Sequence, residues 1–528
     1  MAAMNGRLGR VMPRIIAAAG AALVVYQWAV ARPLWLDEEQ IALNIRERGL
    51  IALAAPLSLG QSAPYGWLAV QRIVVDLLGT GERALRLVPL LFGLGAIAAA
   101  LWIGRRWLRP VGASALVLMI AIGQWLSYSY VELKHYSADA CFGLLLPALA
   151  VWALETDRAA VWWIAATLAQ FLSNGAVFVT PACGALLVIA TWRRRGVRAA
   201  VGAAAPGLVW LAAFAINYVI VLRPAETSAY LQTYWQSQFP PANVGAIQWF
   251  GARLGDFAVK PGGAPLGPLL WMAAVVGWAV ARERRRMLGL AFALMPLSAF
   301  ALATARFVPF FERLMLWLVP ALYVGVALLV DELARSPRVI ERGGPASAPL
   351  ARVGRMAVWV TGAIGGVGCC AAVAWAGLDD LRARPKDSHH RLDDRSAVRW
   401  LRAREQSGDM WITTHLAVPA VWWYASGDRP ILEARPAEAG TECRADALAA
   451  AIPASSRAMV FLGFRFDDVP KDFDEVLLAA LSEVGQITAY RGFGDASRVA
   501  IVDRRLSSRH DRKLPRTICV AVAPARRW

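Results

Sequence analysis

The chain has 528 residues, of which 58% are apolar, and its formal net charge is +18. Soluble domains contain roughly 45–50% apolar residues, so we expect much of this chain to lie in a lipid bilayer. The basic residues cluster beside apolar runs. This placement indicates membrane topology and contact with anionic lipids, and it argues against nucleic-acid binding.

Eleven apolar runs approach the length of a membrane-spanning helix, which is about 17–25 residues. They lie near 14–31, 86–104, 111–127, 138–154, 159–173, 176–192, 200–222, 265–281, 287–304, 313–330 and 356–377. The first run ends in Ala29-Val30-Ala31, which resembles a signal-peptide cleavage site. We favour a retained helix over a cleaved signal peptide, because the charge alternation described next requires it.

Arginine clusters lie at every second boundary between these runs, and this alternation predicts the orientation of the chain. The clusters are Arg7 to Arg14, Arg105 to Arg109, Arg193 to Arg198, Arg282 to Arg286 and Arg335 to Arg355. Basic loops remain in the cytoplasm, so the N-terminus is expected inside and residues 32–85 and 223–264 form external loops. The sequence therefore predicts a polytopic α-helical membrane core over 1–377 and an extracytoplasmic domain over 378–528.

The residues after Gly377 have the pattern of a small α/β domain. Strand-length apolar runs alternate with helix-like stretches: Met410–Thr414, Val418–Ala425, Ala458–Phe464, Asp472–Val484 and Arg498–Val502. Outside the cytoplasm a disulfide between Cys443 and Cys519 is permitted, and free thiols are the alternative. We expect the Arg-rich tail 504–516 to be disordered or lipid-facing, and 337–349 to be a cytoplasmic linker.

Three consecutive carboxylates, Asp37, Glu38 and Glu39, lie early in the first external loop. One interpretation is structural, since Asp37-x-x-Gln40 fits a capping box and acidic residues suit a helix N-terminus. The other is functional, since carboxylates pressed against a membrane are costly without a use. Asp37 and Glu38 are therefore candidate catalytic residues.

A second polar group lies where the third run ends and the fourth begins, on the same side of the membrane. It comprises Glu132, Lys134, His135, Tyr136 and Asp139. Helical spacing predicts that Glu132, Tyr136 and Asp139 share one face. An interfacial belt with a snorkelling lysine is the alternative. Because Asp139 enters an apolar run, where a carboxylate normally has a purpose, these residues are candidate substrate ligands.

Arginines also occur at a third external position, in the turn from Arg306 to Arg313. Arginine binds phosphate oxygens bidentately, so Arg306 and Arg313 are candidate ligands for an anionic group. A surface pair between Glu312 and Arg313 is the alternative.

Together these residues resemble the GT-C membrane glycosyltransferases, in particular the protein O-mannosyltransferase and lipid A aminoarabinose transferase branches. The resemblance is carried by Trp35 to Gln40, Gln61 to Trp67, Gly81 to Pro89, Glu132 to Asp139 and Glu312 to Leu314. It implies a polyprenyl-phosphate sugar donor, an external active site and an essential first-loop acid at Asp37, with Asp139 as the acid of the second external loop. The chain departs from the family pattern by having no His beside Asp37 and Gln61-Ser-Ala-Pro64 in place of Lys-Pro-Pro.

The chemistry that we expect is sugar transfer at the extracytoplasmic face of a membrane, such as the bacterial inner membrane. A polyprenyl phosphate leaves as an anion, so Lys134, Arg306 and Arg313 would stabilise charge while Asp37 accepts the acceptor's proton. Glu38 would assist, or would hold a divalent metal ion with Asp37. Gln61 and the polar group around Lys134 would contact the lipid-linked donor, and the acceptor lies in or outside the membrane.

Two other classes remain as alternatives. A multi-span transporter or lipid flippase also carries buried charges, but transporters tend to place them at mid-bilayer and to contain inverted repeats. No repeat is apparent, and the charges lie at one surface. A membrane scaffold with an external binding domain would leave the Asp37 and Asp139 carboxylates without a role.

Overall fold

The computed structural model describes residues 2–282, 284–334, 349–383, 392–425, 430–437, 443, 447–454, 456–465, 470–506 and 518–523. The chain divides into two compact units. One contains Met1–Val30 and Gly49–Arg382, and the other contains Ala31–Arg48 and Ala383–Trp528. The sequence predicts a core over 1–377 with an external loop over 32–85, and the structure groups Ala31–Arg48, the segment that carries Asp37, with the C-terminal unit. The expected linker 337–349 and basic tail 504–516 fall almost entirely outside the described residues.

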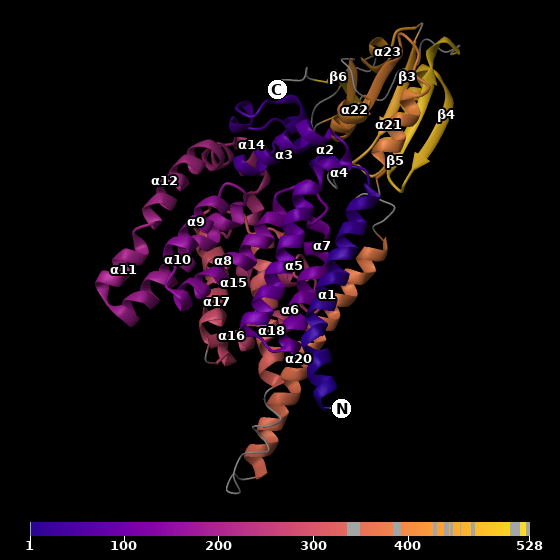
Figure 1. Ribbon diagram of the computed structural model, residues 1–528. Helices are drawn as coiled ribbons and strands as arrows, with labels where there is room; N and C mark the ends of the chain where they lie inside the picture. The colour runs from indigo at the N-terminus through magenta and orange to yellow at the C-terminus, as the bar shows by residue number, and fades with distance from the viewer. Residues whose placement is uncertain are drawn as a thin grey trace. The chain divides into compact units, whose positions relative to one another are not determined.

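The first unit is a bundle of apolar helices (Figure 1). Its longer helices are α1 (Ala2–Val30), α3 (Tyr65–Leu78), α5 (Leu87–Trp107), α6 (Pro110–Ile122), α8 (Tyr136–Thr156), α9 (Ala159–Ala169), α10 (Asn174–Arg195), α11 (Val197–Ala204), α12 (Gly207–Asn217), α15 (Gly245–Val259), α16 (Gly267–Val280), α17 (Arg284–Thr304), α18 (Val319–Leu333) and α20 (Pro349–Ala383). Short elements connect them: η1 (Ala52–Ala54), α4 (Glu82–Leu85), α7 (Gln124–Ser129), η2 (Tyr218–Leu222), α13 (Arg223–Glu226), α14 (Ala229–Tyr234), η3 (Gln236–Gln238) and η4 (Glu312–Leu318).

The bundle is that of a membrane protein, as the sequence predicted. Among the described residues, seven helices are long and apolar enough to cross a membrane, and three more apolar helices are shorter. Each of the eleven expected runs coincides with a helix, the last with α20. The number of crossings, eleven, stays a prediction.

Small residues let the helices of the bundle approach closely. A Cβ atom on Gly277 of α16 would collide with the backbone carbonyl of Gly325 in α18, and a Cβ on Gly93 of α5 would meet the ring of Tyr130. Such close approach is how helices associate in lipid, where burial of apolar surface gives little driving force. Gln27 of α1 donates to the carbonyl of Leu381 in α20, so the first and last helices of this unit lie side by side (Figure 1).

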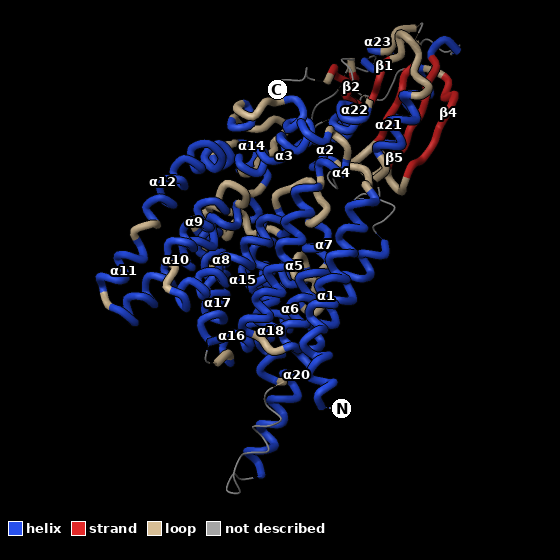
Figure 2. The backbone as a smooth tube through the Cα atoms, viewed as in Figure 1, coloured by secondary structure: helices blue, strands red, loops and turns tan. Residues whose placement is uncertain are grey.

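The C-terminal unit is an α/β domain, and it contains all six described strands (Figure 2). Its strands are β1 (Met410–Thr414), β2 (Ile431–Pro436), β3 (Arg457–Leu462), β4 (Gln486–Phe493), β5 (Ser497–Asp503) and β6 (Ile518–Val522). Its helical elements are α2 (Leu36–Glu47), α21 (Asp394–Arg402), η5 (His415–Ala417), α22 (Val418–Tyr424), α23 (Ala447–Ala451), α24 (Phe473–Val484) and η6 (Arg504–Leu506).

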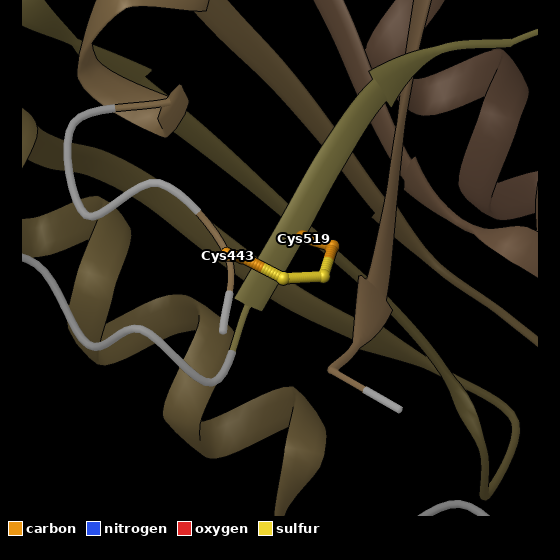
Figure 3. Close-up of a disulfide and its surroundings, with 2 residues drawn as sticks. All are labelled: Cys443 and Cys519. Atoms are coloured by element: carbon orange, nitrogen blue, oxygen red, sulfur yellow. A yellow bond between two sulfur atoms is a disulfide. The ribbon is translucent and has the colours of Figure 1, made fainter. Parts of the chain in front are cut away.

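The sheet has the order β4-β5-β3-β1-β2-β6. Strands β1, β2 and β3 run parallel at its centre, whereas β4, β5 and β6 pair antiparallel. The predicted strands at β1, β3 and β5 are confirmed within two residues, and the predicted helices appear as α22 and α24. A disulfide joins Cys443 to Cys519 of β6 (Figure 3).

Candidate functional site

Asp37 lies in the first turn of α2, a helix that the C-terminal unit holds. The carbonyl of Trp35 accepts the backbone N–H groups of Glu38 and Glu39, at 2.8 and 2.9 Å, so the helix begins at Leu36. The predicted capping box from Asp37 to Gln40 is therefore wrong, because the N-cap is Trp35 and the helix begins two residues earlier than that box requires. Glu38 takes the capping role instead, its Oε2 accepting from the N–H of Trp35 at 3.4 Å.

The three carboxylates differ in their environments. Asp37 is half-buried, whereas Glu38 and Glu39 are 0% and 1% exposed. Burial, followed by the charges of Asp394 and Glu38, raises the pKa of Glu39 well above its ordinary value. A buried carboxyl of raised pKa binds its proton tightly. Asp37 is thus the carboxylate that a ligand can reach.

Several contacts within the C-terminal unit fix the segment that carries Asp37. The N–H of Leu34 donates to the hydroxyl of Tyr424 at 2.8 Å, and the Arg395 guanidinium donates to the carbonyl of Ala31 at 2.8 Å. The ring of Trp35 packs edge-on against Phe464, with centroids 6.3 Å apart. These contacts join residues 31–35 to the C-terminal unit, whose main segment begins at Ala383.

The second polar group gathers in the membrane unit, at the turn before α8. The predicted shared helical face is wrong for Glu132, because α8 begins only at Tyr136 and residues 131–135 form a turn. One side chain of the turn has a partner far away in the sequence. Lys134 Nζ donates to Gln61 Oε1 at 2.5 Å, although the two lie 73 residues apart. Glu132 and Tyr136 are buried at 3% and 5% exposure.

Asp139 binds the start of α10. Its Oδ1 accepts from the Ser173 hydroxyl at 2.6 Å and from the Gly175 N–H at 2.9 Å. A carboxylate suits the N-terminus of a helix, where backbone N–H groups lack intrahelical partners. The buried Asp139 therefore has a structural purpose, which the substrate-ligand interpretation did not anticipate.

His135 connects this network to α3. Its Nε2 lies 3.2 Å from Asn174 Nδ2 and 3.5 Å from Asp139 Oδ2, and its ring meets that of Trp67 edge-on at 6.2 Å. Burial, aided by the Lys134 charge, lowers the pKa of His135 to about 3. The imidazole is therefore neutral at physiological pH.

The two candidate arginines lie just before η4 and within its first turn. Arg306 is exposed, with its guanidinium 5.1 Å from the centroid of the Phe239 ring. Arg313 is half-buried and follows Glu312 at the start of η4. Their joint action with Lys134 on a phosphate group stays a prediction.

A cavity of about 260 Å³ beside η4 contains cations that the sequence interpretation missed. It is lined by Arg253, Gly255, Asp256, Phe257, Val259, Lys260, Phe310, Phe311 and Glu312. Arg253 forms an ion pair with Asp256 at 3.2 Å. A signal was present, because Arg253 and Lys260 are basic residues in a loop that the positive-inside pattern places outside, where such residues are scarce.

The acidic residues do not form an evident metal centre. Across the part of the chain that the structure describes, no group of three His, Cys, Asp or Glu side chains is placed to hold a metal ion. Asp37 and Glu38 thus have no third ligand of these types among those residues.

No family model and no curated protein matches the chain. It is similar to two crystal structures of ArnT from Cupriavidus metallidurans, each 15% identical. The apo state has a TM-score of 0.48 over 93% of this chain and 99% of that one. The state bound to undecaprenyl phosphate has a TM-score of 0.46 over 92% and 97%. A cryo-EM structure of the mycobacterial arabinofuranosyltransferase AftD is 14% identical, with a TM-score of 0.39 over 76% of this chain and 29% of that one.

Proposed function

We propose that this protein is a membrane glycosyltransferase that moves a sugar from a polyprenyl-phosphate carrier to a hydroxyl acceptor at the extracytoplasmic face. The observation that carries the proposal is the environment of the first-loop carboxylates. Asp37 remains accessible while its two neighbours are buried. A carboxylate that is both held by a helix and reachable by ligand has the properties of a general base.

The proposed step needs one base and no acid. Asp37 accepts the acceptor's hydroxyl proton as the oxygen bonds to the anomeric carbon, and the bond from that carbon to the phosphate oxygen breaks. The electron pair leaves with the polyprenyl phosphate, which is stable as an anion and requires no proton. Glycosidases differ because they activate a poor leaving group with a second carboxyl.

Cations of the membrane unit would stabilise the departing phosphate. Lys134 is only 4% exposed, and a buried ammonium acts on an anion through a low effective dielectric. Arg313 and the cavity residues Arg253 and Lys260 provide further positive charge. Glu38, committed to the start of α2, would support Asp37 by position rather than by proton transfer.

Two observations support an extracytoplasmic C-terminal domain. The Arg clusters assign the cytoplasmic side to the opposite ends of the apolar runs. The Cys443–Cys519 disulfide is of a kind that persists in oxidising compartments. A bacterial inner membrane with its periplasmic face fits both.

Mass spectrometry of lipids that copurify with the protein tests the proposal. We expect a polyprenyl phosphate bearing a sugar, and transfer of that sugar to a cell-envelope acceptor in proteoliposomes. Recovery of no polyprenyl lipid, together with movement of lipid across the vesicle bilayer without transfer, would instead identify a flippase.

A further inference from the structure

Among the described buried side chains of the membrane unit with unpaired hydrogen-bonding atoms, four belong to one set of mutual neighbours on α3, before α8 and at the start of α10. These atoms are Trp67 Nε1, both amide atoms of Gln71, His135 Nδ1 and Asn174 Oδ1. Trp67 and Gln71 are each 0% exposed. Buried polar atoms are nearly always paired in native proteins, so several orphans in one region indicate a group that binds there.

Contacts place Trp67, His135 and Asn174 together, and helical spacing puts Gln71 on the same side. The backbone N–H of Trp67, not its indole N–H, donates to the carbonyl of Phe171 at 3.0 Å. This bond brings the start of α3 beside the segment that leads into α10. The rings of Trp67 and His135 meet, and His135 contacts Asn174. Gln71 follows Trp67 by one helical turn and therefore lies on the same face of α3.

The donors and acceptors of this group define the chemistry of the ligand. With the Asn174 amide oriented so that its nitrogen faces His135, that nitrogen donates to Nε2 of the neutral imidazole, and Nδ1 then carries the proton. The unpaired atoms are then N–H donors on Trp67, His135 and Gln71 and carbonyl acceptors on Gln71 and Asn174. A phosphate has only acceptor oxygens near neutrality and cannot satisfy the two carbonyls. Adjacent hydroxyls both donate and accept, and an indole ring suits the apolar face of a sugar.

We propose that Trp67, Gln71, His135 and Asn174 form a sugar-binding subsite that holds the ring of the transferred sugar. This inference rests on the proposed function and deepens it by assigning the head group of the donor, rather than its phosphate, to these residues.

Replacement of Gln71 by leucine in the full-length protein tests the subsite. An apolar side chain of similar size removes two orphaned atoms, so the melting temperature should stay equal or rise. Affinity for mannosyl-phosphoundecaprenol, or for the glycosylated lipid recovered from the protein, should fall about tenfold, as expected for the loss of one or two neutral hydrogen bonds. Affinity for undecaprenyl phosphate, which has no sugar, should not change.

Gln27→Leu is the matched control. Gln27 is also a buried glutamine, but its amide donates to the Leu381 carbonyl, so this variant should lose thermal stability and keep its lipid affinity. Unchanged binding of the glycosylated lipid by Gln71→Leu, even with a tenfold loss of transfer, would overturn the assignment of this subsite to the transferred sugar.

Unchanged binding and transfer in Gln71→Leu would show that the orphaned atoms hold only water, and would overturn the inference while leaving the proposed function intact. Failure of the wild-type protein to bind either lipid would overturn the proposed function, and this inference with it.

Discussion

The guanidinium of Arg46 lies over the ring of Trp423, 4.5 Å from its centroid, and it also donates to the carbonyls of Trp422 and Trp423 at 3.3 and 3.5 Å. Arg46 is in the last turn of α2, and Trp35, at the other end of the helix, packs on Phe464. The C-terminal domain therefore contacts α2 at both of its ends. If Asp37 is the base, this domain positions it.

We expect Arg46→Ala to loosen α2 and to lower transfer about tenfold while donor binding persists. The substitution removes a cation–π contact of about 0.5–2 kcal/mol and two hydrogen bonds. Arg46→Lys should recover part of the loss, since an ammonium retains the cation–π contact. Arg498→Ala removes an exposed ion pair of the same domain with Glu475 and should leave transfer unchanged. Equal activity of Arg46→Ala and Arg498→Ala would show that α2 holds its position without Arg46.

Asp37→Asn separates a base from a structural carboxylate. Because Glu38 rather than Asp37 caps α2, asparagine should fold normally. Loss of the proton acceptor should lower transfer by about 10²-fold or more. Glu39→Gln is the control, because it neutralises a carboxylate whose buried charge is already disfavoured, and it should keep transfer. Near-normal transfer by Asp37→Asn in proteoliposomes would remove the central support for the proposed mechanism.

Lys134→Met tests whether the buried ammonium serves the leaving phosphate. Methionine preserves most of the volume and removes the charge, so we expect donor use to fall by about 10²-fold. Lys134 was expected near water, but the structure buries it beside Gln61. The melting temperature of the Lys134→Met protein must therefore be measured alongside its transfer activity. A variant that unfolds at a lower temperature yet transfers normally would assign Lys134 to the architecture of the turn.

The parts of this fold that could be predicted from the sequence are those with local patterns. Each apolar run coincides with a helix, and the central strands β1 and β3 follow from short apolar segments. Strands β2, β4 and β6 are not predicted from the sequence. Strand β4 is an edge strand with largely exposed side chains, and such a strand gives little of the apolar pattern on which a prediction depends.

The sequence indicates which residues belong to the candidate site, but not which distant residues they contact. Sequence spacing identified Asp37, Lys134 and Asp139, yet it could not show that Leu34 bonds to Tyr424, 390 residues away. It predicts Asp139 as a substrate ligand, which stays a prediction, but it could not show that this carboxylate also accepts from the N–H of Gly175 in α10. The contacts of these residues are made with partners far away in the sequence, and local sequence periodicity contains no information about such partners.

Stability of the C-terminal domain should depend on pH through Asp394. Burial raises the pKa of this carboxyl from 3.8 to about 7, with Ser497 Oγ donating to its Oδ1 at 2.7 Å. Between these values the folded state keeps a proton that the unfolded state releases, so stability falls as pH rises from about 4 to about 7. Asp394→Asn should therefore melt at a higher temperature than wild type at pH 8, with the difference shrinking toward pH 4.5. Melting curves that shift equally at both pH values would contradict this linkage.

The orientation of the chain can be tested from both sides of α20. A phosphatase reporter that folds only outside the cytoplasm should be active when fused after Leu378 and inactive when fused at Ala346, because the Arg-rich residues from Arg335 to Arg355 are predicted to stay inside. The disulfide gives an independent measurement. In cells lysed under alkylating conditions, Cys443 and Cys519 should react with a maleimide only after reduction, and Cys443→Ser should destabilise the domain by about 2–4 kcal/mol. An active reporter at Ala346, with both cysteines reactive before reduction, would place the domain that holds Asp37 in the cytoplasm. The proposed transfer would then have to occur on the inner face, where the donor would be drawn from the cytoplasmic leaflet.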